Sequence, residues 1–74
     1  MKLVLVILSI MGLNQEPLPG AKVELIGTDK VYYTNLKGQV TIPNNFDVKV
    51  SYISYQTKIV SKNNIQQPII LISR

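Results

Sequence analysis

The chain of 74 residues contains no cysteine and no histidine. Without cysteine it can form neither disulfide bonds nor a thiolate nucleophile. Without histidine it lacks the commonest transition-metal ligand and the usual general base of enzymes. These absences argue against zinc binding and against nucleophilic catalysis by a serine or cysteine paired with histidine.

Acidic residues are scarce: the sequence has Glu16, Glu24, Asp29 and Asp47. Three of them lie in or beside predicted turns, and no pair has a spacing that suggests cooperation in acid–base chemistry. Asp29 and Asn35 could offer oxygens to calcium, but such a site needs about six oxygens and usually several carboxylates. We therefore expect a protein that is not an enzyme and that needs no metal or other cofactor.

Basic residues outnumber acidic ones, and the net charge is +4. The eight basic residues are scattered and never adjacent, whereas a nucleic-acid-binding surface would gather them on one face among aromatic side chains. Surface solubility explains them better than nucleic-acid binding does. They are Lys2, Lys22, Lys30, Lys37, Lys49, Lys58, Lys62 and Arg74.

The N-terminal apolar run, residues 3–13, follows a single lysine and resembles a secretory signal. It is too short to cross a bilayer as a helix, which takes about 20 residues, and no small-residue cleavage site follows it. Valine, isoleucine and leucine dominate the run, and it ends at a turn. These features predict the first strand of the domain.

Apolar and polar residues alternate along most of the remaining chain, between turns rich in glycine, proline and asparagine. Alternation with a period of two is typical of strands in an antiparallel sandwich or barrel. We expect one all-β domain over residues 1–74, an antiparallel β-sandwich of about seven strands. The expected strands are residues 3–13, 21–26, 31–34, 39–42, 47–53, 55–60 and 69–73.

The first expected strand is apolar on both faces. Val4, Val6, Leu8 and Ile10 form one face, and Leu3, Leu5, Ile7 and Met11 form the other. A strand with one solvent-exposed face should be polar on that face. Either a segment such as residues 61–68 covers the second face, or that face binds a protein partner or a second copy of the chain.

The aromatic residues, apart from Phe46, are Tyr32, Tyr33, Tyr52 and Tyr55. Tyr32 and Tyr33 are consecutive and should point to opposite faces of a strand. Tyr52 and Tyr55 should also face opposite ways unless the chain bends at Ser54. One interpretation is that the rings fill the edge of the sandwich; the other is that they form a platform for a sugar or peptide.

Three motifs appear in order: Pro-Leu-Pro-Gly-Ala at 17–21, Thr-Asn-Leu-Lys-Gly-Gln-Val at 34–40 and Ser-Tyr-Ile-Ser-Tyr at 51–55. Together with the Gly-Thr pair at 27–28, they resemble the carboxypeptidase regulatory-like domain family. That family has a transthyretin-like, or prealbumin-like, β-sandwich fold. The resemblance extends from about Val6 to Ile72. The chain departs from the family pattern at Gly12, Gln15, Asn35, Val40 and Ser54.

These departures should not break the fold. Asn35 keeps a side-chain carbonyl that can cap the amides of its turn. That turn ends at Gly38, which we expect to have a positive φ. Ser54 must accept a bend that glycine would adopt more cheaply.

The resemblance implies an extracytoplasmic protein of the periplasm, outer membrane or cell surface. Domains of this family often extend TonB-dependent outer-membrane receptors or accompany surface proteins, and they have no peptidase zinc site. We therefore expect a non-catalytic interaction or spacer module with no membrane span of its own. The alternative is a small carbohydrate-binding module that uses exposed tyrosines. An exposed apolar patch or an open sheet edge favours the first; coplanar tyrosines beside a groove favour the second.

Overall fold

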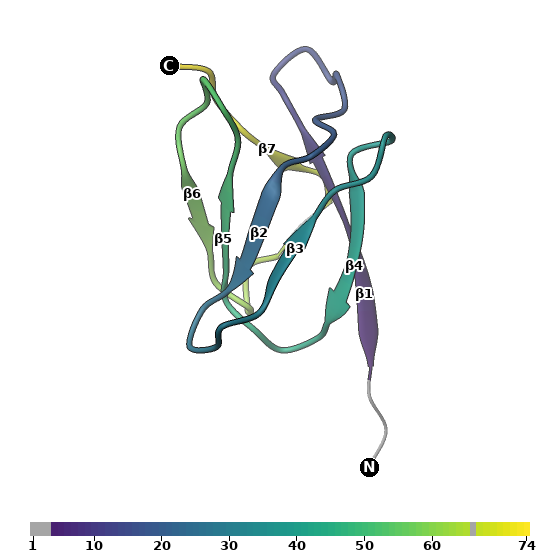
Figure 1. Ribbon diagram of the computed structural model, residues 1–74, viewed down its shortest axis with the longest axis vertical. Helices are drawn as coiled ribbons and strands as arrows, with labels where there is room; N and C mark the ends of the chain where they lie inside the picture. The colour runs from purple at the N-terminus through teal and green to yellow at the C-terminus, as the bar shows by residue number, and fades with distance from the viewer. Residues whose placement is uncertain (1–3, 66) are drawn as a thin grey trace.

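The computed structural model describes residues 4–65 and 67–74, and these residues form an all-β structure without helices (Figure 1). Accordingly, nothing in the described part of the chain is a helix able to cross a membrane. The strands are β1 (Leu5–Met11), β2 (Lys22–Leu25), β3 (Val31–Tyr33), β4 (Gln39–Pro43), β5 (Val48–Ser51), β6 (Lys58–Val60) and β7 (Ile69–Ile70).

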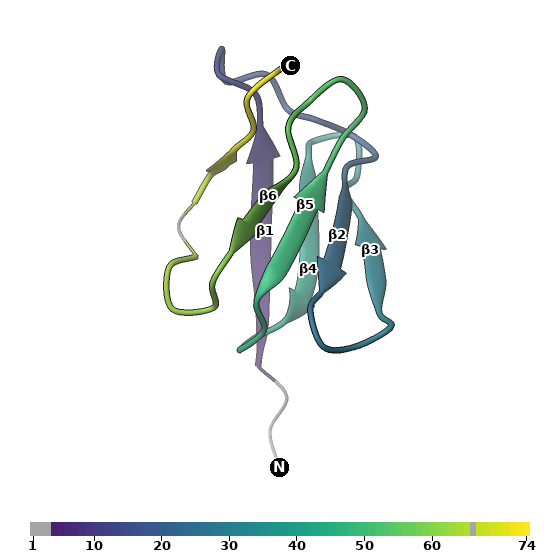
Figure 2. The ribbon, with the colours of Figure 1, turned by 90° about the vertical axis from the view of Figure 1, so that its left-hand side faces the viewer.

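The strands form two packed sheets, an arrangement consistent with a small β-sandwich. One sheet has the order β4-β1-β7, and the other has the order β3-β2-β5-β6. Figure 2 shows the second sheet in front, with β1 and β4 behind it. The prediction of an all-β protein is therefore confirmed.

Alternating side chains from both sheets meet in the core. In β1, Leu8 and Ile10 are fully buried, while Leu5 and Ile7 on the opposite face are exposed. The same alternation buries every second residue of β2, β4 and β5, because successive side chains of a strand point to opposite faces. The other buried apolar residues are Leu18, Ala21, Val23, Leu25, Val40, Ile42, Val48, Val50, Val60, Ile69 and Leu71.

The expectation of purely antiparallel pairing is wrong at one place, because β7 runs parallel to β1. The chain crosses from β6 in one sheet to β7 in the other, so it returns beside β1 in the same direction. The pairing is short: Ile10 lies opposite Ile69, and Met11 lies opposite Ile70. The other strand pairs are antiparallel among the described residues.

Several strands are shorter than expected. Ser54 has a φ of 68°, so the chain bends there and β6 begins at Lys58 rather than at residue 55. Leu71 N still donates to Met11 O at 2.8 Å. Beyond Leu71 the chain leaves β1 and pairs with the bend, where Gln56 N donates to Ile72 O and Arg74 N to Ser54 O. β1 ends before Gly12, and Leu3 lies outside the described residues.

The turn at residues 35–38 forms as the sequence predicts. Gly38 N donates to Asn35 O at 2.9 Å, and Gly38 has a φ of 72°. The Asn35 Oδ1 atom accepts hydrogen bonds from Lys37 N at 2.9 Å and Gln39 N at 3.0 Å. The asparagine therefore caps the turn amides, as expected for this residue.

Candidate functional site

The outer face of β1 exposes large aliphatic side chains. Leu5 is 55% exposed and Ile7 is 59% exposed, whereas Met11 is half-buried. Leu5 lies opposite Pro43 of β4, and Met11 lies opposite Ile70 of β7, so these neighbours extend the apolar surface on the same face. The second face of β1 is therefore an exposed apolar surface. Leu3, the remaining residue of the predicted set, lies outside the described residues.

Near its beginning, one edge of β1 has no neighbouring strand within residues 4–65 and 67–74. Asn44 N donates to Val4 O and Ile10 N donates to Gly38 O, so the backbone groups of the even-numbered residues face β4. The odd-numbered residues face the other edge, where β7 pairs only with Ile10 and Met11. The Leu5 N–H, the Leu5 C=O and the Ile7 N–H have no hydrogen-bond partner in the described part of the chain.

The side chain of Gln67 occupies the next part of this edge. Its amide nitrogen donates to the Ile7 carbonyl, and its amide oxygen accepts from Ser9 N at 2.8 Å. These two bonds imitate those of a neighbouring strand. The segment 61–68 was expected as a possible cover for the second face of β1. Gln67 of this segment contacts the edge of β1 instead, and Leu5 and Ile7 are exposed.

The tyrosines do not meet on one surface. Tyr32 points inward and packs against the core, whereas Tyr33 lies on the outer face of the β3-β2-β5-β6 sheet and is 63% exposed. Tyr52 and Tyr55 are half-buried at the end of the sandwich, with ring centroids 5.6 Å apart and planes tilted by 56°. The bend at Ser54 brings these two rings together.

The Tyr55 hydroxyl donates a hydrogen bond to Glu16 Oε1 at 3.1 Å. This hydrogen bond, together with desolvation and the negative charge of Glu16, raises the pKa of Tyr55 above its ordinary value of 10.0. Gly12 leaves the necessary space, because a Cβ atom there would overlap Glu16 Oε1 and lie 3.2 Å from the Tyr55 hydroxyl oxygen. The contact joins residues 39 positions apart, so no local sequence pattern indicates it.

Two further carboxylates make contacts within the chain. Glu24 lies 3.5 Å from the Lys22 ammonium, and Asp47 Oδ1 accepts from Lys62 N at 2.7 Å. Within residues 4–65 and 67–74, no three acidic side chains gather where they could hold a metal ion.

From the sequence, Leu5, Ile7 and Met11 were identified and an open sheet edge was allowed for, but the contact of Gln67 with that edge was missed. The apolar residues were detectable because their alternation is a local pattern. Gln67 contacts backbone atoms of residues about 60 positions away, and a glutamine in a polar loop carries no signal of such a contact.

Comparison with the models of known protein families found no match for this chain, and comparison with curated proteins found none either.

Proposed function

We propose that this protein is a non-catalytic interaction module that binds protein through the outer face and open edge of β1. The observation that supports this proposal is the position of Leu5 and Ile7, which are more than half exposed. They lie beside backbone groups of the same strand that have no hydrogen-bond partner among the described residues. Exposed aliphatic side chains next to a free sheet edge suit strand addition, because backbone hydrogen bonds and apolar burial act together there.

The alternative function, sugar binding through a tyrosine platform, has less support. Sugar-binding platforms need aromatic rings that share a surface, but Tyr32 and Tyr33 point to opposite faces of β3. Tyr52 and Tyr55 pack against each other at a tilt of 56°, and Tyr55 is engaged with Glu16. Neither pair offers a flat, open surface.

The expected affinity is modest. Burying a few hundred Å² of apolar surface contributes several kcal/mol at about 25 cal/mol per Å². The loss of translational freedom and the ordering of side chains offset much of this gain. We infer a reversible monomer–dimer equilibrium in the absence of another partner.

The cellular setting is part of the proposal and rests on the sequence motifs. Residues 17–21, 34–40 and 51–55 resemble the carboxypeptidase regulatory-like family, whose fold is transthyretin-like. By this resemblance the module is extracytoplasmic and acts as an interacting or spacing element of an outer-membrane TonB-dependent receptor or a surface-protein system.

Sedimentation of the full chain at several concentrations tests the proposal. The parent should associate as concentration rises, and a variant with Leu5→Lys and Ile7→Lys should remain a folded monomer. The matched control carries Val31→Lys and Ile59→Lys, which change exposed aliphatic residues on the other sheet, and it should associate like the parent. A parent that stays monomeric at high concentration, with a double-lysine variant that unfolds, would show that the β1 face belongs to the core.

A further inference from the structure

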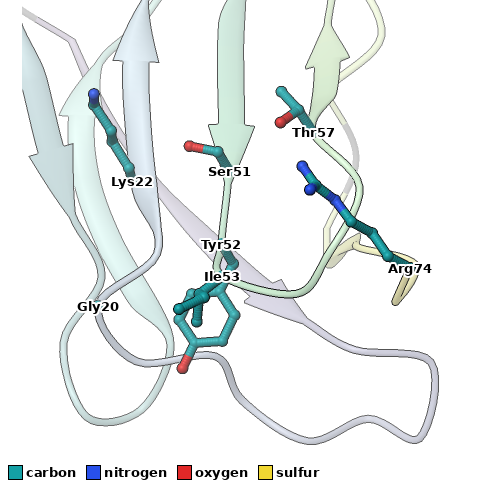
Figure 3. A pocket seen from close by; sticks show the side chains of 7 residues that line it. All are labelled: Gly20, Lys22, Ser51, Tyr52, Ile53, Thr57 and Arg74. Carbon is teal, nitrogen blue, oxygen red and sulfur yellow. The ribbon is translucent and has the colours of Figure 1, made fainter.

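A shallow groove of about 360 Å³ lies on the other sheet, away from the β1 face. Figure 3 shows Lys22, Ser51, Thr57 and Arg74 in a row across it, with Tyr52 and Ile53 at one end. The residues that line it include two with cationic side chains and none with an acidic side chain.

Strand register places the polar side chains side by side. Lys22 of β2 lies directly opposite Ser51 of β5. Val50 lies opposite Lys58, so the same register brings Thr57 next to Ser51. Gly20, beside Lys22 in the lining, has open space where a Cβ would stand, so no side chain closes that end. The row therefore presents an ammonium and two hydroxyl groups to the solvent.

Backbone contacts hold Arg74 at the other side of the groove. Its N–H donates to Ser54 O at 3.0 Å, and its Nε donates to Tyr55 O at 3.1 Å. The two terminal amino groups of the guanidinium have no partner among the described residues. An arginine anchored in this way keeps two parallel donors available, and such a pair matches the two oxygens of a carboxylate.

Lys22 already contacts a carboxylate within the chain, since Glu24 Oε1 lies 3.5 Å from its Nζ atom. Both side chains are partly exposed, so this ion pair is weak and leaves Lys22 able to attract a second carboxylate. Ser51 and Thr57 add hydroxyl donors between the two cations. The groove is thus complementary to a negative group.

We propose that this groove binds a carboxylate side chain of an extended acidic protein segment. Ile53 is 83% exposed in the lining and offers an apolar contact for a residue next to that carboxylate. A free inorganic anion would make no apolar contact with Ile53, whereas a peptide could contact it with a side chain next to the carboxylate. This difference favours a peptide as the ligand. The site goes beyond the proposed function because it lies on the opposite sheet from β1, so one module can hold two partners at once.

An NMR titration of the isotope-labelled full chain at low salt tests this proposal. The probe is a blocked tripeptide of sequence Glu-Ile-Glu, and the matched neutral probe is Gln-Ile-Gln. The acidic probe should produce saturable shifts in the amides of residues 51–57 and 74, with a dissociation constant in the millimolar range. The neutral probe should produce none.

Charge variants distinguish this groove from general attraction to a basic protein. A variant with Lys22→Gln and Arg74→Gln should bind the acidic probe about tenfold more weakly. A control with Lys37→Gln and Lys49→Gln has the same net charge and should bind like the parent. If the double variant in the groove does not fold, the Lys22→Gln variant alone provides the comparison.

Three results would overturn the proposal: no saturable shifts, equal weakening in the control, or inorganic sulfate that binds with the same shifts and affinity. The Leu5→Lys, Ile7→Lys variant should retain binding of the acidic probe. Failure of self-association and failure of the groove are therefore separate outcomes.

Discussion

At the scale of single residues, Thr34 joins two distant parts of the chain. Thr34 is the buried residue with a polar side chain among the residues that the structure describes. Its hydroxyl accepts from Ala21 N at 2.8 Å and donates to Leu18 O at 2.6 Å. The proline-rich turn before β2 is thereby held against the end of β3.

Replacing Thr34 tests this connection. The change Thr34→Val keeps the shape but leaves the Ala21 N–H and the Leu18 C=O unpaired in a buried site, which should cost about 2–4 kcal/mol of unfolding free energy. The control Thr34→Ser keeps the hydroxyl and should lose much less. Urea unfolding of both variants measures the difference, and equal losses would contradict a role for the hydrogen bonds.

Tyr55 makes a second prediction at this scale, concerning pH. The folded protein binds the phenolic proton more tightly than the unfolded chain does, because the hydroxyl donates to Glu16. The resulting stabilisation is complete below about pH 10 and is lost as the pH rises through the higher folded-state pKa. The parent should therefore lose its stability advantage over Tyr55→Phe above pH 10.0. Melting temperatures of both proteins across this range provide the measurement, and a difference independent of pH would contradict the coupling.

At the scale of structural elements, the turn at residues 35–38 positions β4 against β1. Gly38 has a positive φ, and a Cβ atom there would lie 2.8 Å from Ile10 O and 3.0 Å from Leu18 N. Both neighbours are backbone atoms of paired segments, so neither can move without breaking hydrogen bonds. The position therefore requires glycine for its conformation and for its space.

The substitution Gly38→Val measures the cost of the positive φ and of the steric overlap together. The substitution Gly27→Val measures the cost of a positive φ alone. Gly27 has a φ of 89° but open space around its Cβ position, so valine there should cost about 1–2 kcal/mol. Gly38→Val should cost more than about 3 kcal/mol, because steric overlap adds to the backbone strain. Chemical denaturation of the two variants would decide the matter, and an unchanged stability for Gly38→Val would disprove this description of the turn.

The strand edges show how the elements limit unwanted pairing. On the outer edge of β4, Pro43 has no N–H group to offer to another strand. On β6, Lys58 lies opposite the buried Val50, and the Lys58 ammonium donates to Ile70 O at 3.3 Å. Proline and inward-pointing charges are devices that protect sheet edges. Gln67 occupies the edge of β1 at Ile7 and Ser9. The part of the β1 edge that can still pair with another strand is therefore the segment around Leu5.

At the scale of the whole molecule, stability depends on one small core without disulfide support. A chain of this length buries about 60–65% of the surface that its unfolded form exposes, so its free energy of unfolding is modest. The fold should need no metal ion, because the acidic residues are dispersed and histidine and cysteine are absent.

Thermal unfolding with and without EDTA tests this expectation directly. The melting temperature should be the same in both conditions, and it should also be unaffected by a thiol reductant. A marked decrease in EDTA would indicate a metal site that the arrangement of Glu16, Glu24, Asp29 and Asp47 does not suggest.

Local patterns in the sequence determined which segments form strands, although not their exact ends. They also determined the buried alternation of residues such as Val23 and Leu25 and the turn from Asn35 to Gly38. These features depend on neighbours within a few residues, because side-chain alternation and turn chemistry act over short distances. Tertiary structure alone decided the parallel pairing of β1 with β7, the separation of the tyrosines and the contact of Gln67 with β1. It also placed Arg74 across the groove from Lys22. Each of these depends on how the chain crosses between sheets, and that path is set by packing of the whole core rather than by any local run of residues.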